Sequence, residues 1–235
     1  MIEIRPFSSL GGADFGWLKA RHHFSFGHYR DPQRMGWGRL RVWNDDEIAP
    51  RTGFDPHPHR DMEIITYVRQ GAITHRDSLG NEGRTEAGDV QVMSAGTGVT
   101  HSEYNMEDET TRIFQIWIMP DVLGAKPAWG AKAFPKAGRE ARLEVLAGGR
   151  PGDAEAGALP INADAAVMAA TLGAGQSLRF ALPEGRAAYL VAARGSATVN
   201  GQALGARDAA AILDEREVEV VAGDEAELVM VEVAA

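Results

Sequence analysis

The chain has 235 residues, 44% of them hydrophobic, so it is long enough to bury a core either as one large all-β unit or as two small domains. Its net charge of -9 gives no basic field for a phosphate backbone, and we expect no direct nucleic acid partner. Cysteine is absent, which excludes disulfides, thiolate nucleophiles and cysteine-bound metal, so any metal must use nitrogen and oxygen ligands.

The first twelve residues, MIEIRPFSSLGG, lack the charged and apolar regions of a secretory signal. No apolar run of about 18 residues follows, so nothing in the sequence predicts a membrane-spanning helix. We therefore expect a soluble cytoplasmic protein with no membrane association.

Short β-branched or aromatic runs bounded by glycine predict strands along the whole chain. In the first half they cover residues 40–43, 64–68, 90–93 and 113–119. The turn-forming segment DSLGNEG at residues 77–83 predicts a hairpin between the second and third runs. Residues 123–141 contain Pro127, Gly130 and Pro135, which interrupt the strand pattern and indicate a connector that can include a short helix. Strand-like runs resume at residues 189–192, 209–213, 218–221 and 228–233.

Two spaced pairs of metal-binding residues lie in the first half. His57 and His59 flank one proline, and His101 and Glu103 flank one serine. Residues two apart in a strand point to the same face, so each pair can present both side chains to one point. If the two strands lie side by side, four nitrogen and oxygen donors converge as a divalent cation requires. This donor set suits iron(II), manganese, cobalt, nickel, copper or zinc and does not choose among them.

A weak internal repeat relates the two halves of the chain. Residues 63–71 align without gaps with residues 187–195, and each segment reads as a strand that ends in glycine. The second copy lacks the polar cluster, because the alignment sets Ala181, Pro183, Val220 and Ala222 opposite His57, His59, His101 and Glu103. No histidine follows His101, so we expect a second half without metal.

The same residues resemble the two sequence motifs of the cupin superfamily, in the form found in pirins. The segment GFDPHPHRDME at residues 53–63, followed by Gly71, resembles the first motif. Gly88-Asp89 and SAGTGVTHSE at residues 94–103 resemble the second. HFSFG at residues 23–27, Asp31-Pro32 and GRLRV at residues 38–42 resemble the segment that precedes the site in pirins, so the similarity covers about residues 5 to 120.

The resemblance implies an all-β bicupin made of two antiparallel β-barrel domains of the double-stranded β-helix or jelly-roll type. The expected limits are residues 1–125 for a metal-binding N-terminal domain, 126–142 for a connector and 143–235 for a metal-free C-terminal domain. It further implies one divalent ion, iron or a similar metal, held by His57, His59, His101 and Glu103. Glu63 then has a structural or supporting role, because pirins take their glutamate ligand from the second motif. A monomer is expected, since the second domain can cover the first.

Resemblance to bacterial pirins also implies quercetin 2,3-dioxygenase activity, in which O2 opens the central ring of a flavonol and carbon monoxide is released. Glu103 is the candidate catalytic base for the flavonol hydroxyl, with the role of ligand alone as the alternative. Two other functions stay open: a metal-sensing or redox-sensing regulatory protein that binds a partner protein, and an isomerase or small-ligand binder on the same scaffold.

Several further residues have a structural interpretation that the sequence favours over a functional one. His22, His23 and His28 are expected to be solvated or hydrogen-bonded loop histidines. We expect His75 at a surface hairpin position and Gln115 at a strand edge. The remaining expectation is that the tryptophans at positions 37, 43 and 117 lie in the core.

Overall fold

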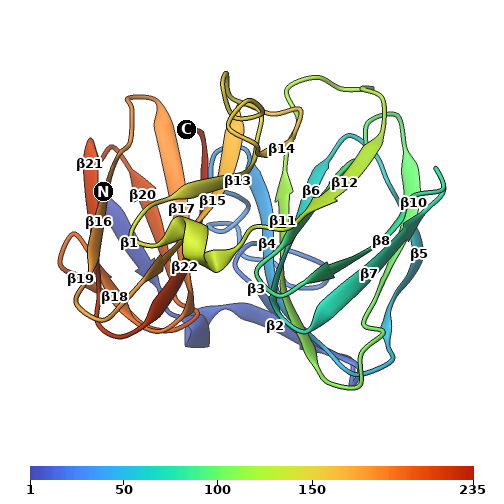
Figure 1. The fold of residues 1–235 in the computed structure, drawn as a ribbon, viewed down its shortest axis with the longest axis horizontal. Coiled ribbons are helices and arrows are strands. Elements are labelled where there is room, and N and C mark those ends of the chain that lie inside the picture. The colour runs from blue at the N-terminus through green and yellow to red at the C-terminus, as the bar shows by residue number, and fades with distance from the viewer.

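The computed structural model describes residues 1–235 and consists almost entirely of antiparallel strands (Figure 1). The strands of the first half are β1 (Ile2–Arg5), β2 (Gly11–Asp14), β3 (Leu18–His22), β4 (Leu40–Ile48), β5 (Gly53–His59), β6 (Glu63–Gln70), β7 (Ala72–Asp77), β8 (Glu82–Glu86), β9 (Val90–Ser94), β10 (Val99–Tyr104), β11 (Thr111–Ile118) and β12 (Ala128–Lys132). Those of the second half are β13 (Glu144–Gly148), β14 (Leu159–Pro160), β15 (Ala165–Leu172), β16 (Ser177–Ala181), β17 (Arg186–Arg194), β18 (Ala197–Val199), β19 (Gln202–Leu204), β20 (Ala209–Leu213), β21 (Glu217–Ala222) and β22 (Ala226–Ala234).

Helix is confined to two 3-10 turns, η1 (Phe7–Ser9) and η2 (Lys136–Arg139). Neither turn has the length and apolar character needed to cross a membrane. Each strand-like run expected from the sequence falls in a strand, apart from Met119 directly after β11. The expected hairpin is β7–β8, in which Arg76 pairs with Glu82 across the turn.

Each half of the molecule contains one seven-stranded and one four-stranded sheet, and the two halves share the order of their central strands. The first half has the orders β12-β9-β6-β11-β4-β3-β2 and β5-β10-β7-β8, and the second has β1-β20-β17-β22-β15-β13-β14 and β16-β21-β18-β19. The strands of the sequence repeat, β6 and β17, occupy the same position in these orders. The fold is therefore an all-β pair of jelly rolls, as the resemblance implied.

The residue-level alignment of the repeat does not hold everywhere. Strand pairing sets His57 opposite His101 in the first half and Leu178, three residues before Ala181, opposite Val220 in the second. Leu178 and Val220 are both buried among apolar side chains. The interior of the second jelly roll is thus filled by a hydrophobic cluster.

The ends of the two halves are interleaved. β1 hydrogen-bonds to β20 of the second half, and in Figure 1 this blue strand lies among the orange and red strands. β12, within the expected connector, pairs with β9 of the first half, and η2 follows it as the expected short helix. The domain limits at residues 125 and 142 stay predictions.

The largest hydrophobic cluster lies between the two halves rather than inside either of them. It joins the outer faces of the two large sheets and includes Trp43, Tyr67 and Phe114 from one half and Tyr189 and Val229 from the other. Burial of each such large side chain stabilises the fold by about 1.5–3 kcal/mol. Because both halves contribute, neither large sheet is covered without the other.

Alternation along the strands leaves the inner face of the first large sheet to other residues. In β4, Trp43 and Asp45 face the second half, whereas the alternating residues Asn44 and Asp46 line an internal cavity. One wall inside the first jelly roll is therefore polar, beside an apolar cluster that includes Leu18, Ile48 and Ile113, whereas the interior of the second jelly roll is apolar.

Candidate metal centre

A row of polar side chains crosses the inner face of the first large sheet. In register across five neighbouring strands lie His22 on β3, Asn44 on β4, Gln115 on β11, Thr66 on β6 and Gln91 on β9. All five are buried. Buried polar groups require hydrogen-bond partners, so such a row indicates a site rather than a packing core.

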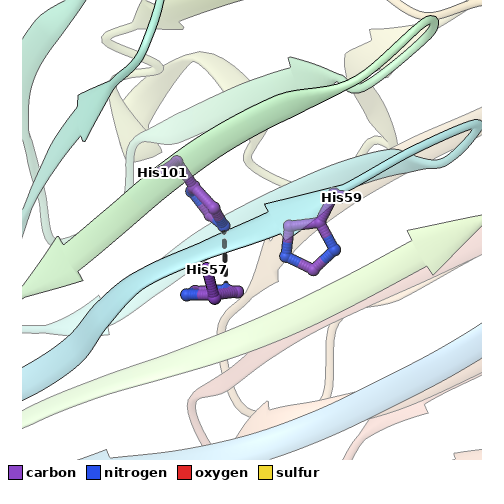
Figure 2. A group of neighbouring side chains, drawn as sticks. All are labelled: His57, His59 and His101. Atoms are coloured by element: carbon purple, nitrogen blue, oxygen red, sulfur yellow. Dashed lines mark hydrogen bonds between the residues drawn. The ribbon is translucent and has the colours of Figure 1, made fainter.

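The predicted neighbours β5 and β10 do lie side by side, as an antiparallel pair in the small sheet. His57 is directly opposite His101, and His59 is opposite Val99. One ring nitrogen from each of His57, His59 and His101 lies within 4.8 Å of the others (Figure 2). The structure brings these three predicted ligands together, and Glu103 is not a member of that group.

In their neutral forms, His57 and His101 carry their protons on the nitrogens that face away from each other. Nδ1 of His57 lies 2.7 Å from the carbonyl oxygen of Asp55, an acceptor, so His57 carries its proton there. A chain of contacts fixes His101 in the same way: Asp77 accepts a hydrogen bond from Nε2 of His75 (3.2 Å), which leaves Nδ1 of His75 to accept one from Nδ1 of His101 (3.4 Å). Both Nε2 atoms therefore present lone pairs, and they face each other at 3.1 Å (Figure 2).

Electrostatics hold these tautomers in place. Burial opposes ionisation of Asp77, but hydrogen bonds from Asn81 and His75 outweigh it and lower its pKa, so it stays an acceptor. Burial, with the neighbouring histidines, lowers the pKa of His59 to about 4 and that of His101 to about 3. At neutral pH both rings are uncharged, the form that binds metal.

The donor geometry fits a divalent cation. Two adjacent nitrogens each about 2.1 Å from an octahedral ion lie about 3.0 Å apart, close to the spacing of the two facing Nε2 atoms. Without a cation or a proton between them, the facing lone pairs repel. The residues present therefore suit a metal ion such as those that imidazole favours.

Glu103 is buried at the end of the polar row and is held by three donors. Oε1 accepts hydrogen bonds from Thr66 (2.9 Å) and Gln91 (2.6 Å), and Oε2 accepts one from Gln115 (2.7 Å). A carboxylate has about four lone-pair positions, two on each oxygen. One position on Oε2 is left for a metal ion or for a proton.

Glu63 has contacts of a structural kind. Its carboxylate accepts hydrogen bonds from Ser94 (2.6 Å) and from Asn162 of the second half (3.3 Å). It is buried and links the two halves.

A cavity of approximately 760 Å³ opens onto the three histidines and Glu103. Its apolar wall includes Phe15, Trp17 and Phe54, of which the last two pack edge to face at 5.2 Å. Its volume lies within the usual range for small-molecule sites, about 300–1,000 Å³. An aromatic ligand of moderate size can enter beside the metal centre.

The structure differs from several expectations about residues outside the two motifs. His22 lies in β3 rather than in a loop, is buried and lines the cavity, whereas His28 is an exposed loop residue as expected and lies at the cavity's edge. His75 is fully buried against His101 and stacks on Trp129 at 4.9 Å, which rules out the surface position expected for it. Gln115 belongs to a central strand, because β11 lies between β6 and β4.

The three tryptophans divide between two environments. Trp43 is fully buried in the core as expected, and Trp37 packs against the same cluster. Trp117 instead lines the cavity and contacts His59 edge to face at 5.0 Å. Sequence reasoning missed Thr66 and Gln91, although a polar residue between apolar neighbours in a strand, as in Val90-Gln91-Val92, is a usable signal.

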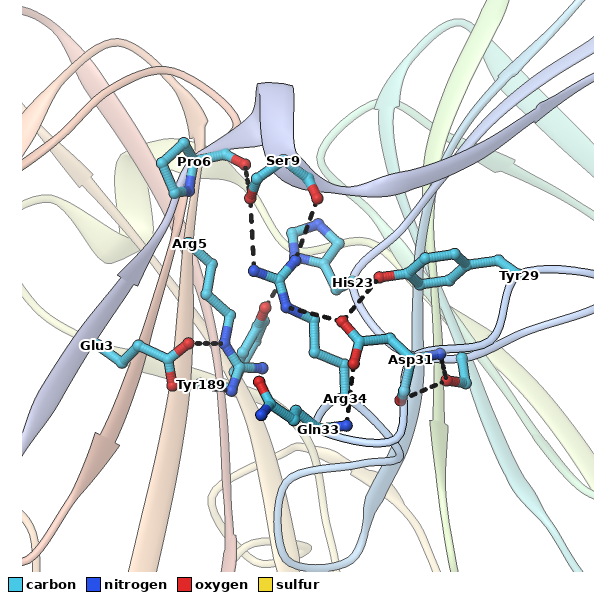
Figure 3. A network of polar contacts seen from close by, with 11 residues as sticks. Glu3, Arg5, Pro6, Ser9, His23, Tyr29, Asp31, Gln33, Arg34 and Tyr189 are labelled. Carbon is cyan, nitrogen blue, oxygen red and sulfur yellow. Dashed lines mark hydrogen bonds and ion pairs between the residues drawn. The ribbon is translucent and has the colours of Figure 1, made fainter.

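The second half helps to hold one wall of the cavity. The loop between β3 and β4 contributes Phe26 and Tyr29 to the lining. At its start, fully buried His23 contacts the hydroxyl of Tyr189 on β17 at 2.9 Å, and further along Arg34 donates to the carbonyl of Ser9 at 3.3 Å (Figure 3). The loop is thereby fixed to the neighbouring half and to the segment after β1.

Comparisons with known proteins agree with this geometry. The family model for pirin matches residues 4–118, and the model described as the quercetinase C-terminal cupin domain matches residues 151–233. A putative quercetin 2,3-dioxygenase of Pseudomonas aeruginosa is 65% identical over 234 residues, and the match covers 100% of both chains. A pirin-like protein of Caulobacter vibrioides is 61% identical, again over 100% of both chains.

A solved structure also points to the pirin family. The bacterial pirin YhhW from Escherichia coli in complex with nickel(II) superposes with a TM-score of 0.93 at 36% identity, and the match covers 100% of this chain and 99% of that one. Both halves and their arrangement are thus accounted for by one family. The chain belongs to the pirin family of cupin proteins.

Proposed function

We propose that this protein is a metal-dependent dioxygenase that opens the central ring of flavonols such as quercetin with O2 and releases carbon monoxide. His57, His59 and His101 hold the ion, and Glu103 completes the set through Oε2. The observation that carries the proposal is the pair of unprotonated Nε2 atoms that face each other at 3.1 Å beside a cavity of approximately 760 Å³. Relatives named as quercetin 2,3-dioxygenases, one of them 37% identical in Escherichia coli, support the choice of reaction.

The chain's own residues supply binding and proton transfer. A divalent ion, when bound, supplies Lewis acidity that lowers the pKa of a coordinated hydroxyl. The apolar wall of Phe15, Trp17 and Phe54 packs against the aromatic rings of the flavonol and excludes water. Glu103 has one free position on Oε2, so it accepts the proton of the 3-hydroxyl only where it leaves the ion; otherwise it serves as a ligand alone. Gln115 donates to the same oxygen and keeps it directed at the cavity.

For the metal we propose iron(II) first. Manganese, cobalt, nickel, copper and zinc are the alternatives, because three imidazoles and one carboxylate accept all of them. Three or four protein ligands leave positions open on a six-coordinate ion, as a catalytic site requires.

The test is reconstitution of metal-free protein with each divalent ion under anaerobic conditions, followed by admission of quercetin and O2. Loss of the flavonol absorbance together with release of carbon monoxide is expected in the wild type and not in His57→Ala. Arg76→Ala is the control, because this exposed side chain lies on the outer side of β7 and pairs with Glu82.

A second variant separates the two roles of Glu103. If Glu103 is the base, Glu103→Gln at saturating metal lowers kcat by about 10²–10⁴-fold. If Glu103 is only a ligand, the variant chiefly weakens metal binding. Fully metallated wild-type protein that leaves quercetin and close analogues intact would overturn the dioxygenase proposal and favour a regulatory role with a protein partner.

A further inference from the structure

The cavity has a second polar wall that the metal centre does not use. It is formed by His22, Asn44 and Asp46 on β3 and β4 of the large sheet, whereas the three metal-site histidines lie on β5 and β10 of the small sheet. All three side chains are buried, with exposed fractions of 5%, 4% and 2%. They face the cavity together because His22 pairs with Asn44 across the strands and Asp46 lies two residues further along β4.

Hydrogen bonding within the protein leaves this wall incomplete. Nδ1 of His22 donates to Oδ1 of Asn44 at 2.8 Å, and this contact uses one polar atom of each side chain. Nε2 of His22, an acceptor, and the Nδ2 amino group of Asn44, a donor, are left for a ligand. Oδ1 of Asp46 is buried with no partner.

The isolation of Asp46 is unusual for a buried acid. Its neighbour Asp45 faces the other way and pairs with Arg69 and, at 2.7 Å, with Arg207 of the second half. Burial, with Asp45 and Glu103 nearby, raises the pKa of Asp46 well above its usual value. An uncompensated buried polar group costs stability, and such groups persist at functional sites.

We propose that His22, Asn44 and Asp46 form a subsite that binds a hydroxyl group on the aromatic ligand, at a distance from the group held by the metal centre. A phenolic hydroxyl matches the wall because it donates one hydrogen bond and accepts others. Nε2 of His22 or a carboxyl oxygen of Asp46 accepts a hydrogen bond from this hydroxyl, and Nδ2 of Asn44 donates one to its oxygen. The substrate class is accordingly a polyhydroxylated aromatic compound rather than an unsubstituted one.

This inference rests on the proposed function for the orientation of the ligand, but binding tests it without turnover. The experiment uses metal-loaded protein of measured metal content under anaerobic conditions. The two probes are quercetin and 3-hydroxyflavone, which share the 3-hydroxyl and 4-carbonyl and differ in the ring hydroxyls. Dissociation constants are obtained from the change in flavonol absorbance on titration.

The wild type is expected to bind quercetin about tenfold more tightly than 3-hydroxyflavone, the ratio that one or two net hydrogen bonds provide. In Asp46→Ala and in His22→Phe this ratio falls to about one, because affinity is lost for quercetin and not for 3-hydroxyflavone. An unchanged ratio in both variants, or no preference in the wild type, would overturn the subsite.

Thermal unfolding of the metal-free protein separates a binding role from a structural one. Asp46→Ala is expected to keep or raise the melting temperature, because it removes an unpaired buried carboxyl. The matched control Asp45→Ala is expected to lower it, because buried Arg69 loses its partner and Arg207 keeps only Glu47. Equal destabilisation by the two substitutions would overturn the proposal.

Failure of the subsite and failure of the dioxygenase give different results. A protein that discriminates between the probes but turns over neither keeps the subsite and loses the proposed reaction. A protein that turns over both probes with equal affinity keeps the reaction and loses the subsite.

Discussion

Replacement of His75 tests how the metal centre is built. His75 touches no proposed open position at the metal, yet it accepts the hydrogen bond from Nδ1 of His101 and so directs the lone pair of Nε2 toward His57. His75→Phe removes the acceptor and keeps a flat ring against Trp129. His101 is then free to carry its proton on Nε2, where it blocks metal binding.

The size of the effect follows from what is lost. A buried donor left without a partner costs about 1–3 kcal/mol, and partners of this kind typically contribute 10–100-fold to metal affinity. We expect metal affinity of His75→Phe to fall by about that factor, measured by competition with a chelator of known affinity. Arg76→Ala, one residue along β7, should leave the affinity unchanged.

The metal-free variant provides the check on folding. Its unfolding free energy should fall by no more than the cost of one unpaired buried donor, about 1–3 kcal/mol, since the ring stacking is retained. Metal affinity within threefold of the wild type in a folded variant would refute the reasoning that His75 sets the tautomer of His101.

Three further predictions concern stability. Glu227 accepts a hydrogen bond from Tyr67 and pairs with Lys136 at 2.5 Å and with fully buried Arg139 at 3.7 Å. Glu227→Ala should therefore lower the unfolding free energy, measured by urea denaturation, by about 3–5 kcal/mol. The control Glu225→Ala, at an exposed side chain, should change it by less than about 0.5 kcal/mol. Burial lowers the pKa of His23 to about 3, below its unfolded value of 6.5, so the folded state binds fewer protons than the unfolded state between these values. The unfolding free energy should therefore fall as the pH drops from 6.5 toward 3, by up to about 1.4 kcal/mol per pH unit. Comparing pH profiles of wild type and His23→Asn isolates this contribution, and identical slopes would contradict it. Because one hydrophobic cluster joins the two halves, both should unfold in a single calorimetric transition, and two separate transitions would contradict the shared core. Metal at a hundredfold excess over its dissociation constant should stabilise the folded protein by about 2.7 kcal/mol.

The sequence was sufficient for the local features of the fold. The runs at residues 64–68 and 189–192 become β6 and β17, because short apolar β-branched segments between glycines have few alternatives to a strand. Two-residue spacing was likewise enough to place His57 and His59 on one face, since the side-chain period of a strand is a local property. The family and the two-part architecture followed from motifs within single segments.

Only the tertiary structure decided which of these segments meet. The polar row of His22, Asn44, Thr66, Gln91 and Gln115 depends on the register of five strands that are far apart in the chain, and no local pattern contains it. The same holds for His75: its place in a hairpin of the sequence does not show that β10, the neighbouring strand in the sheet, sets His101 against it.

The N-terminal strand illustrates the difference between what the sequence and what the tertiary structure determined. Residues 2–5 stand at the start of the first half in the sequence, yet they pair with β20 near the far end of the chain, because the open edge of the second large sheet offers unpaired backbone groups there. Strand propensity and ligand spacing depend on residues that are neighbours in the chain, so the sequence alone determined them. Edge pairing, register and the surroundings of a buried acid such as Asp46 depend on segments that meet only in the folded chain, so the tertiary structure alone decided them.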